Sequence, residues 1–248
     1  MESNYEPFTN YLTIKGRGDG FGAQYQAIMS GVALCEFKKY KYFHTPFVDI
    51  QHLGLDEIEK MNNFIGIKNE NYDDTTLQKI QENLQVVMEF EDAHYHCKNP
   101  SIYYTDKVLK QIRDWYFSTE KPKIDDVDIA IHIRRGDVNS SWADRYTDNI
   151  EYKKIINSLR LKYPSYKITV VSEGNIDEFK DLGLEDFCFL LNGDVTIAFH
   201  TLVSAKVLVM SKSSFAYTSA ILNSNTIYYM GFWHRALDDW LSVNNLLL

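Results

Sequence analysis

One short motif gathers three charged side chains and a histidine around a glycine: His132-Ile133-Arg134-Arg135-Gly136-Asp137. It overlaps the end of an apolar, β-branched run, Val127–Ile133, which is typical of a buried parallel strand. Arginine offers a permanently charged donor fork that matches phosphate oxygens, and ligands of open α/β sheets bind outside the carboxyl ends of strands. The motif therefore predicts a diphosphate site. The alternative is a surface ion-pair cluster, which stabilises a protein little.

A second group of anion donors follows another apolar run, Lys206–Met210. Ser211, Ser213 and Ser214 come directly after this predicted strand, and a helix is predicted over Phe215–Asn223. Hydroxyl and N–H groups at a helix N-terminus bind anions. Helix capping alone would explain one of the serines but not all three.

A glycine-rich turn near the N-terminus is the second candidate site. It spans Gly16–Gly22, after a predicted strand (Tyr11–Lys15) and before a predicted helix (Gln24–Phe37). Gly20 and Gly22 permit positive φ angles and close approach of a ligand. The glycines alternate, so the turn lacks the Gly-x-Gly-x-x-Gly spacing of a dinucleotide fingerprint.

The elements that position these groups are clearest in the second half of the chain. Strands and helices alternate there over short loops, which predicts right-handed crossovers and a parallel, doubly wound sheet. The predicted strands are Val127–Ile133, Lys167–Ser172, Phe187–Leu191, Lys206–Met210 and Thr226–Met230, and the predicted helices are Asn149–Leu161, Ile176–Leu182, Thr196–Ser204 and Phe215–Asn223.

The first half is less regular. Further strands are predicted at Tyr42–Phe47 and Leu84–Phe90. The polar stretch Ser118–Asp126, which contains Pro122, is the predicted linker. We therefore expect an α/β protein with two domains, residues 1–120 and 121–248, facing a cleft.

The arginine motif resembles the signature of the superfamily of α1,2-, α1,6- and protein O-fucosyltransferases. Val170–Asn175, a strand ending in Ser and an acid, resembles the second motif of that superfamily, and Met210–Phe215 resembles its third. Gly18–Gln24 resembles its N-terminal Gly-x-Gly-x-x-x-Gln segment. The resemblance covers most of residues 125–230, while residues 45–115 match nothing recognised.

The resemblance implies a glycosyltransferase-B type fold with two Rossmann-like domains. The C-terminal domain would bind the nucleotide sugar, and the N-terminal domain would lie on the acceptor side. It further implies an inverting, metal-independent transfer of fucose from GDP-fucose to a glycan hydroxyl. The GDP-sugar would be a co-substrate, so no cofactor is expected.

The resemblance also assigns roles by position. Arg134 would bind the β-phosphate and stabilise departing GDP, and His132 would lie near the guanine or ribose. The phosphate oxygens would be held by Ser213, Ser214 and Phe215.

Five further residues are predicted to contribute to donor binding. They are Arg135, Asp137, Glu173, Gly20 and Gly22, with Asp137 placed to orient a guanidinium.

An inverting transfer needs a base for the acceptor hydroxyl. Asp19 resembles the carboxylate that protein O-fucosyltransferases can carry in the equivalent turn, and it is the candidate base; the alternative is an ordinary turn aspartate. The third motif departs from the α1,2 enzymes, because Lys212 stands where they usually have Asn, and Ala216-Tyr217 follows Phe215. This departure argues against the α1,2 linkage and leaves another GDP- or UDP-linked hexose or pentose open as the donor sugar. A separate alternative is a non-catalytic nucleotide- or glycan-binding module, which would share the arginines but lack a base.

No metal site is predicted. Asp126-Val127-Asp128 has an Asp-x-Asp pattern but lies where a strand begins, and His94-Tyr95-His96-Cys97 lacks a second cluster of ligands.

The bulk composition restricts the setting. The chain of 248 residues has a net charge of -8, which is a poor basis for nucleic-acid binding. Its three cysteines are odd in number, as in a reducing compartment. The sequence shows no signal peptide and no apolar run of membrane-spanning length. We expect a cytoplasmic protein in a bacterial or viral setting, acting in the bacterial cytosol or in that of a virus-infected host; the oligomeric state is left open.

Overall fold

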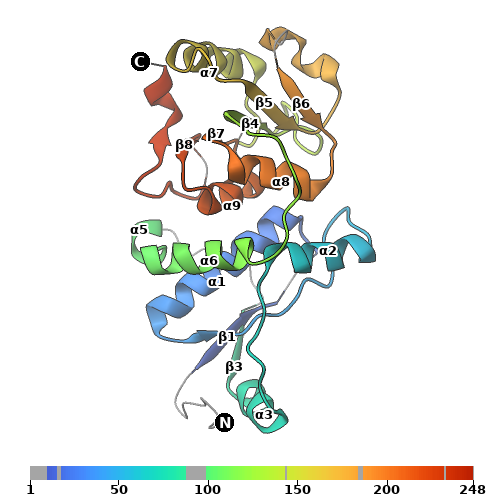
Figure 1. The fold of residues 1–248 in the computed structure, drawn as a ribbon, viewed down its shortest axis with the longest axis vertical. Helices are drawn as coiled ribbons and strands as arrows, with labels where there is room; N and C mark the ends of the chain where they lie inside the picture. Colours follow the sequence, from blue (N-terminus) through green and yellow to red (C-terminus); the bar gives the residue numbers. More distant parts are fainter. Residues whose placement is uncertain are drawn as a thin grey trace. The chain divides into compact units, whose positions relative to one another are not determined.

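The structure is a computed structural model that describes residues 10–15, 18–87, 99–142, 144–183, 187–231 and 233–247. The chain forms two compact units, Met1–Glu120 and Lys121–Leu248 (Figure 1). Each unit contains a sheet in which every described strand pair is parallel. The predicted α/β class is therefore confirmed.

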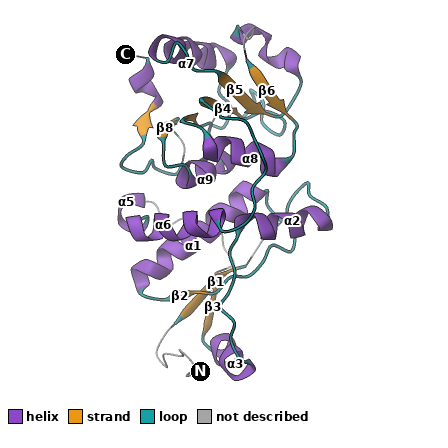
Figure 2. Cartoon of the chain, in the orientation of Figure 1, coloured by secondary structure: helices purple, strands orange, loops and turns teal. Residues whose placement is uncertain are grey.

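The first unit is built on a three-stranded sheet of order β2-β1-β3 (Figure 2). Its strands are β1 (Tyr11–Ile14), β2 (Lys41–Tyr42) and β3 (Leu84–Val87). Helix α1 (Phe21–Lys38) connects β1 to β2 and packs closely on β1. A Cβ atom at Gly31 of this helix would lie only 2.6 Å from Ile14 Cγ1, so glycine permits the close packing.

Four described helices of this unit were not predicted from the sequence. They are α2 (Leu55–Ile65), α3 (Asp74–Glu82), α5 (Pro100–Tyr103) and α6 (Asp106–Phe117). Two of them have side-chain caps: Asp73 accepts from Thr76 N at 2.7 Å, and Thr105 accepts from Val108 N at 3.4 Å. Such caps favour a helix start at these positions.

The strand predicted over Tyr42–Phe47 is wrong beyond Tyr42. His44 and Phe47 donate their backbone N–H groups to the side-chain amides of Asn69 and Asn62, at 2.7 and 2.8 Å. These side chains replace the strand partners that a ladder would require. Of the strand predicted over Leu84–Phe90, the structure describes β3 as far as Val87.

The second unit contains a six-stranded sheet of order β6-β5-β4-β7-β8-β9. Its strands are β4 (Ile129–Ile133), β5 (Ile168–Ser172), β6 (Cys188–Leu191), β7 (Val207–Val209), β8 (Thr226–Tyr229) and β9 (Leu241–Ser242). Counted from β4 as the first strand, the order is 3-2-1-4-5-6, which is the order of Rossmann sheets. The order reverses between β4 and β7. Strand β9 was not predicted.

Helices cover both faces of this sheet (Figure 1). One face carries α7 (Asn149–Lys162), η1 (Ile176–Leu182) and η2 (Val243–Leu246), and the other carries α8 (Val195–Ser204) and α9 (Ser214–Leu222). Alternation along β4 sends Ile131 and Ile133 into the core beneath α7. It sends His132 toward α9, where its ring lies 5.6 Å from that of Phe215. Apart from β9 and η2, the described elements of this unit were predicted, with boundary errors of a few residues.

In the described part of the chain, no helix combines the length and the apolar character that crossing a bilayer requires.

Candidate functional site

The carboxyl ends of β4 and β7 meet at the point where the strand order reverses. The two strands pair in parallel with Ile131 opposite Val209. Just beyond this register, His132 Nδ1 and Ser211 Oγ lie 2.6 Å apart and join the two strand ends. In open α/β sheets, the crevice outside such a switch point is where ligands bind.

Arg134 is held in place by Asp137. Its Nη2 and Nε donate to the two carboxylate oxygens at 2.8 and 3.3 Å, and its side chain is 21% exposed. Burial raises the pKa of Asp137, but the hydrogen bond and charge of Arg134 and the charge of Arg145 outweigh it, so the pKa is lowered overall. Asp137 is therefore an ionised carboxylate that orients Arg134, as predicted from its type.

Arg135 contributes its guanidinium to the fold. It is only 4% exposed and donates to Arg134 O at 2.8 Å and to Asn149 Oδ1 at 2.7 Å. The guanidinium carbon lies 4.4 Å from the ring centroid of Tyr146, within the range of a cation–π contact. Asn149 in turn donates to Glu178 O at 2.5 Å. Arg135 thus ties the end of β4 to the beginning of α7.

His132 is a neutral imidazole. Burial, followed by the charge of Arg134, lowers its pKa to about 3. Its hydrogen bond to Ser211 Oγ and its contact with Phe215 fix the ring. At neutral pH this histidine can position a ligand through hydrogen bonds but carries no charge.

Helix α9 begins at this site with a serine cap. Ser213 Oγ accepts from Phe215 N at 3.2 Å, and Ser213 N donates to Ser211 O at 2.9 Å. Ser214 is the first residue of the helix, and Phe215 packs edge-on against Phe199. The first-turn N–H groups of a helix carry its positive dipole end, so this terminus favours an anion.

Glu173 lies against the arginine motif from the neighbouring strand. Ser172, at the end of β5, donates through Oγ to Ile133 O at 2.6 Å. Gly136 has a φ of +73°, and a Cβ atom built there would lie 2.2 Å from Glu173 Oε2. The motif therefore needs glycine at this position for its backbone conformation, while the Glu173 side chain would have to move aside for a Cβ atom.

The glycine-rich turn belongs to the first unit. Gln24 Nε2 donates to the backbone oxygens of Asp19 and Asp49, both at 2.7 Å, and so fixes the turn beside Asp19. The positive φ expected for the turn is not found at Gly20, whose φ is -64°. Gly22 lies inside α1, because this helix begins three residues earlier than predicted.

The acidic pair at the start of β4 has a structural role. Asp128 accepts from Lys206 Nζ at 2.7 Å and from Lys167 N at 3.2 Å, so it is engaged in holding strand ends. Among the described residues, no three His, Cys, Asp or Glu side chains are grouped as metal ligands would be. His94, His96 and Cys97 lie outside the described residues.

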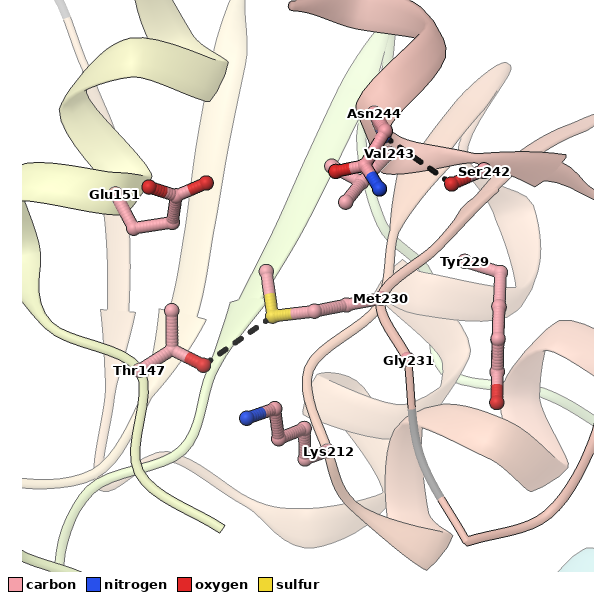
Figure 3. Close-up of a pocket in the computed structure, with 9 residues that line it drawn as sticks. All are labelled: Thr147, Glu151, Lys212, Tyr229, Met230, Gly231, Ser242, Val243 and Asn244. Atoms are coloured by element: carbon pink, nitrogen blue, oxygen red, sulfur yellow. Dashed lines mark hydrogen bonds between the residues drawn. The ribbon is translucent and has the colours of Figure 1, made fainter. Parts of the chain in front are cut away.

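A pocket of about 380 Å³ adjoins this site and was not found from the sequence (Figure 3). It lies where β7 and β8 end and α7 and η2 begin. Its lining consists of Thr147, Glu151, Lys212, Tyr229, Met230, Gly231, Ser242, Val243 and Asn244. In the sequence, Lys212 was the residue that could have indicated this pocket, because it departs from the third motif. The pocket is also lined by residues of β9 and η2, which the sequence did not predict.

No family model and no curated protein sequence matches the chain. Several solved structures are similar over most of its length. Heptosyltransferase WaaC of E. coli with ADP aligns with 94% of this chain and 92% of its own, at 10% identity and a TM-score of 0.47. POFUT1 in complex with GDP-fucose aligns with 90% and 96%, at 11% identity and a TM-score of 0.46. Arabidopsis thaliana FUT1 with GDP aligns with 94% and 72%, at 13% identity and a TM-score of 0.45.

Proposed function

We propose that the chain is an inverting, metal-independent glycosyltransferase of the glycosyltransferase-B type that transfers fucose from GDP-fucose to a glycan hydroxyl. One observation carries the proposal. Arg134 leaves the end of β4, and the serine-capped end of α9 follows β7, on the two sides of the switch point of a Rossmann-ordered sheet. A cation and a helix N-terminus at this point suit the diphosphate of a nucleotide.

Charge stabilisation explains how such a site would promote transfer. As the sugar–phosphate bond breaks, negative charge grows on the β-phosphate of departing GDP. Arg134, whose Nε and Nη2 are bound to Asp137, would offer its remaining guanidinium N–H groups to that charge. The N–H of Ser214 would add the dipole of α9, while the N–H of Phe215 is already donated to Ser213 Oγ. Preorganised donors of this kind lower a barrier without reorganising during the reaction.

The remaining assigned residues would support the donor from the fold. Arg135 donates to the backbone oxygen of Arg134 and so fixes the segment that carries it. Glu173 packs on Gly136 and would shape the same loop. His132, being neutral, would donate or accept a hydrogen bond at the ribose or guanine.

The acceptor hydroxyl must lose a proton as it attacks, and we assign this role to Asp19. It lies in a turn that Gln24 braces through two hydrogen bonds. Gly20 has open space where a Cβ atom would lie and would allow a sugar to approach the backbone, whereas Gly22 is buried in α1 and is not assigned this role. A conservative Asp19→Asn substitution should lower kcat while leaving the GDP affinity unchanged.

The variant that tests the nucleotide assignment is Arg134→Ala. We expect it to abolish the GDP-induced rise in melting temperature and to slow transfer by roughly 100- to 1,000-fold, since one preorganised donor contributes about that much. Arg160→Ala is the matched control, because Arg160 belongs to the same unit but donates to Gly183 O, away from the motif. A variant at Arg134 that binds GDP and transfers sugar at wild-type rates would refute the proposal.

The identity of the donor is tested separately with a nucleotide panel. A ligand at 100 times its Kd stabilises the native state by about 2.7 kcal/mol, so selective binding is visible as a thermal shift. We expect shifts with GDP and GDP-fucose and none with UDP or ADP. A response to UDP alone would replace the GDP-fucose assignment by another nucleotide sugar.

A further inference from the structure

Lys212 reaches into the pocket beside the proposed diphosphate site. The residue stands between Ser211, which bonds His132, and Ser213, which caps α9. Ser211 faces His132 on the α9 side of the sheet, whereas the pocket that Lys212 lines includes Glu151 of α7 and Val243 of η2. Figure 3 shows the Lys212 ammonium inside this space, on the side of Thr147.

The pocket lining carries one basic and one acidic side chain, Lys212 and Glu151. The Glu151 carboxylate is paired with Lys154 at 3.2 Å rather than with Lys212. Lys212 forms no ion pair or hydrogen bond with any residue that the structure describes, and its side chain is only half-exposed. A half-buried ammonium without a partner attracts an anionic group.

The rest of the lining suits a sugar ring. Met230 and Val243 supply apolar surface, while Ser242 and Asn244 supply polar groups at the edge. The volume of about 380 Å³ lies within the range of small-molecule sites. Fucose carries no charge, so within the proposed donor only the diphosphate could pair with Lys212, and that group is proposed on the α9 side of the sheet, whereas the pocket lies on the α7 side.

We infer that the pocket binds an acidic acceptor, a glycan whose sugar carries a carboxylate such as a hexuronate, and that Lys212 recognises this carboxylate. The inference rests on the proposed function, because it names the acceptor of the same reaction. It places an acceptor subsite in the second unit, whereas the resemblance implies an acceptor side in the first. Lys212 would thereby determine specificity, and its ammonium would hold the acceptor beside the diphosphate without taking part in the bond changes.

The test compares two probes that differ only in the carboxylate, methyl β-glucuronide and methyl β-glucoside. Binding to the full chain is measured in saturating GDP by titration monitored with NMR. We expect the wild type to bind the glucuronide about tenfold more tightly, since a charge-assisted hydrogen bond is among the stronger polar contacts. Lys212→Gln should abolish the preference, Lys212→Arg should retain most of it, and the GDP affinity of both should remain within about twofold of wild type.

Lys153→Gln is the control, because Lys153 is an exposed α7 lysine outside the pocket lining and should keep the preference. Equal binding of the two probes, or a preference that survives in Lys212→Gln, overturns the inference. A large loss of GDP affinity in Lys212→Gln also overturns it, because Lys212 would then bind the diphosphate. A second arm compares UDP-glucuronate with UDP-glucose without GDP, and a carboxylate preference confined to that arm would place the acid on the donor instead.

The two proposals fail separately. If GDP does not bind but Lys212 still selects the glucuronide, the proposed transfer is wrong and the acidic-sugar pocket stands. If GDP binds and no carboxylate preference is found, the acidic-acceptor inference is wrong and the proposed nucleotide site stands.

Discussion

Two adjacent arginines at the end of β4 have opposite environments. Arg134 is partly exposed and paired with a carboxylate, whereas Arg135 is enclosed and donates to neutral oxygens. Within the described residues, Arg135 has no carboxylate partner, and the aromatic ring of Tyr146 covers its guanidinium. Its charge therefore adds to the positive potential of the segment beside the proposed diphosphate site. The sequence was compatible with one arginine binding the ligand and the other stabilising the fold, but it could not show which arginine has which role.

This division predicts a difference between two alanine variants. Arg135→Ala removes the donor of Asn149 Oδ1 and Arg134 O, and each of these part-buried hydrogen bonds contributes about 0.5–1.5 kcal/mol. We expect a clear loss of unfolding free energy in urea, and Arg135→Lys should not restore it, because lysine lacks the planar fork. Arg134→Ala should cost less stability than Arg135→Ala, because its partner Asp137 is 56% exposed and can be hydrated when the guanidinium is lost. Equal stability losses in the two variants would contradict the assignment.

At the scale of elements, the turn after β4 depends on one glycine. Gly136 has a φ of +73°, where a non-glycine residue costs about 1–2 kcal/mol. The Glu173 carboxylate can move aside from an added Cβ atom, but the Glu173 Cβ at 3.2 Å adds a small steric cost. We expect Gly136→Ala to lower the melting temperature and weaken GDP binding together, because the segment that carries Arg134 must shift.

Two further variants separate the causes of that loss. Glu173→Ala in the Gly136→Ala background should recover only the part of the loss that the carboxylate causes. Gly20→Ala is the control for stability, because a Cβ atom there meets nothing within 4 Å and its φ is -64°. If Gly136→Ala were as stable as Gly20→Ala, the backbone argument would fail.

The elements differ in how far the sequence predicts them. In the second unit, β-branched runs alternate with helical periods, and both signals agree with the parallel sheet. In the first unit, the aromatic run from Tyr42 suggested a strand as far as Phe47, but asparagine side chains take the backbone N–H groups at its end. Helix α6 buries Val108, Ile112 and Tyr116 at a spacing of four, a helical period that the sequence contained and that went unused.

The candidate site, like the elements, could be predicted from the sequence only in part. The carboxyl ends of β4 and β7 could be placed from the pattern, so the groups around the switch point were within reach of the sequence. The pocket at Lys212 was not, because β9 has two residues and η2 only four, too short for any periodicity. Which residues contact substrate is still a prediction at every position.

At the scale of the whole molecule, buried histidines should govern the response to acid. Burial lowers the pKa of His44 to about 4, of His132 to about 3 and of His234 to about 4. Each takes up a proton near pH 6.5 when the chain unfolds, so the unfolded state binds more protons below that pH. Stability is therefore full above about pH 6.5 and is lost as the pH falls toward 4, by up to about 1.4 kcal/mol per pH unit for each histidine.

Urea unfolding at several pH values between 7.5 and 5 measures this slope. His234→Gln should reduce this slope by about one proton, because the buried imidazole is then absent from both the folded and the unfolded state. Carboxylates such as Asp137, whose pKa is lowered, lose their contribution only at lower pH. A free energy of unfolding that stays constant from pH 7.5 to 5 would show that these imidazoles are not buried in solution.

The division into two units predicts that nucleotide binding resides in one of them. Each unit has its own parallel sheet, and every described residue around the switch point of the larger sheet belongs to Lys121–Leu248. We expect a fragment of residues 121–248 to unfold cooperatively and to bind GDP within about tenfold of the full chain, because the core beneath α7 lies wholly inside it. The fragment should transfer no sugar, since Asp19 is missing, and a fragment of residues 1–120 should not respond to GDP.

If the larger fragment fails to fold, the intact chain can be cleaved by limited proteolysis between residues 118 and 126, with and without GDP. The unit whose further digestion GDP slows is then the unit that binds the nucleotide. Protection of the first unit alone, or a folded C-terminal fragment that ignores GDP, would place the nucleotide outside the β4–β7 switch point and remove the basis of the proposed reaction.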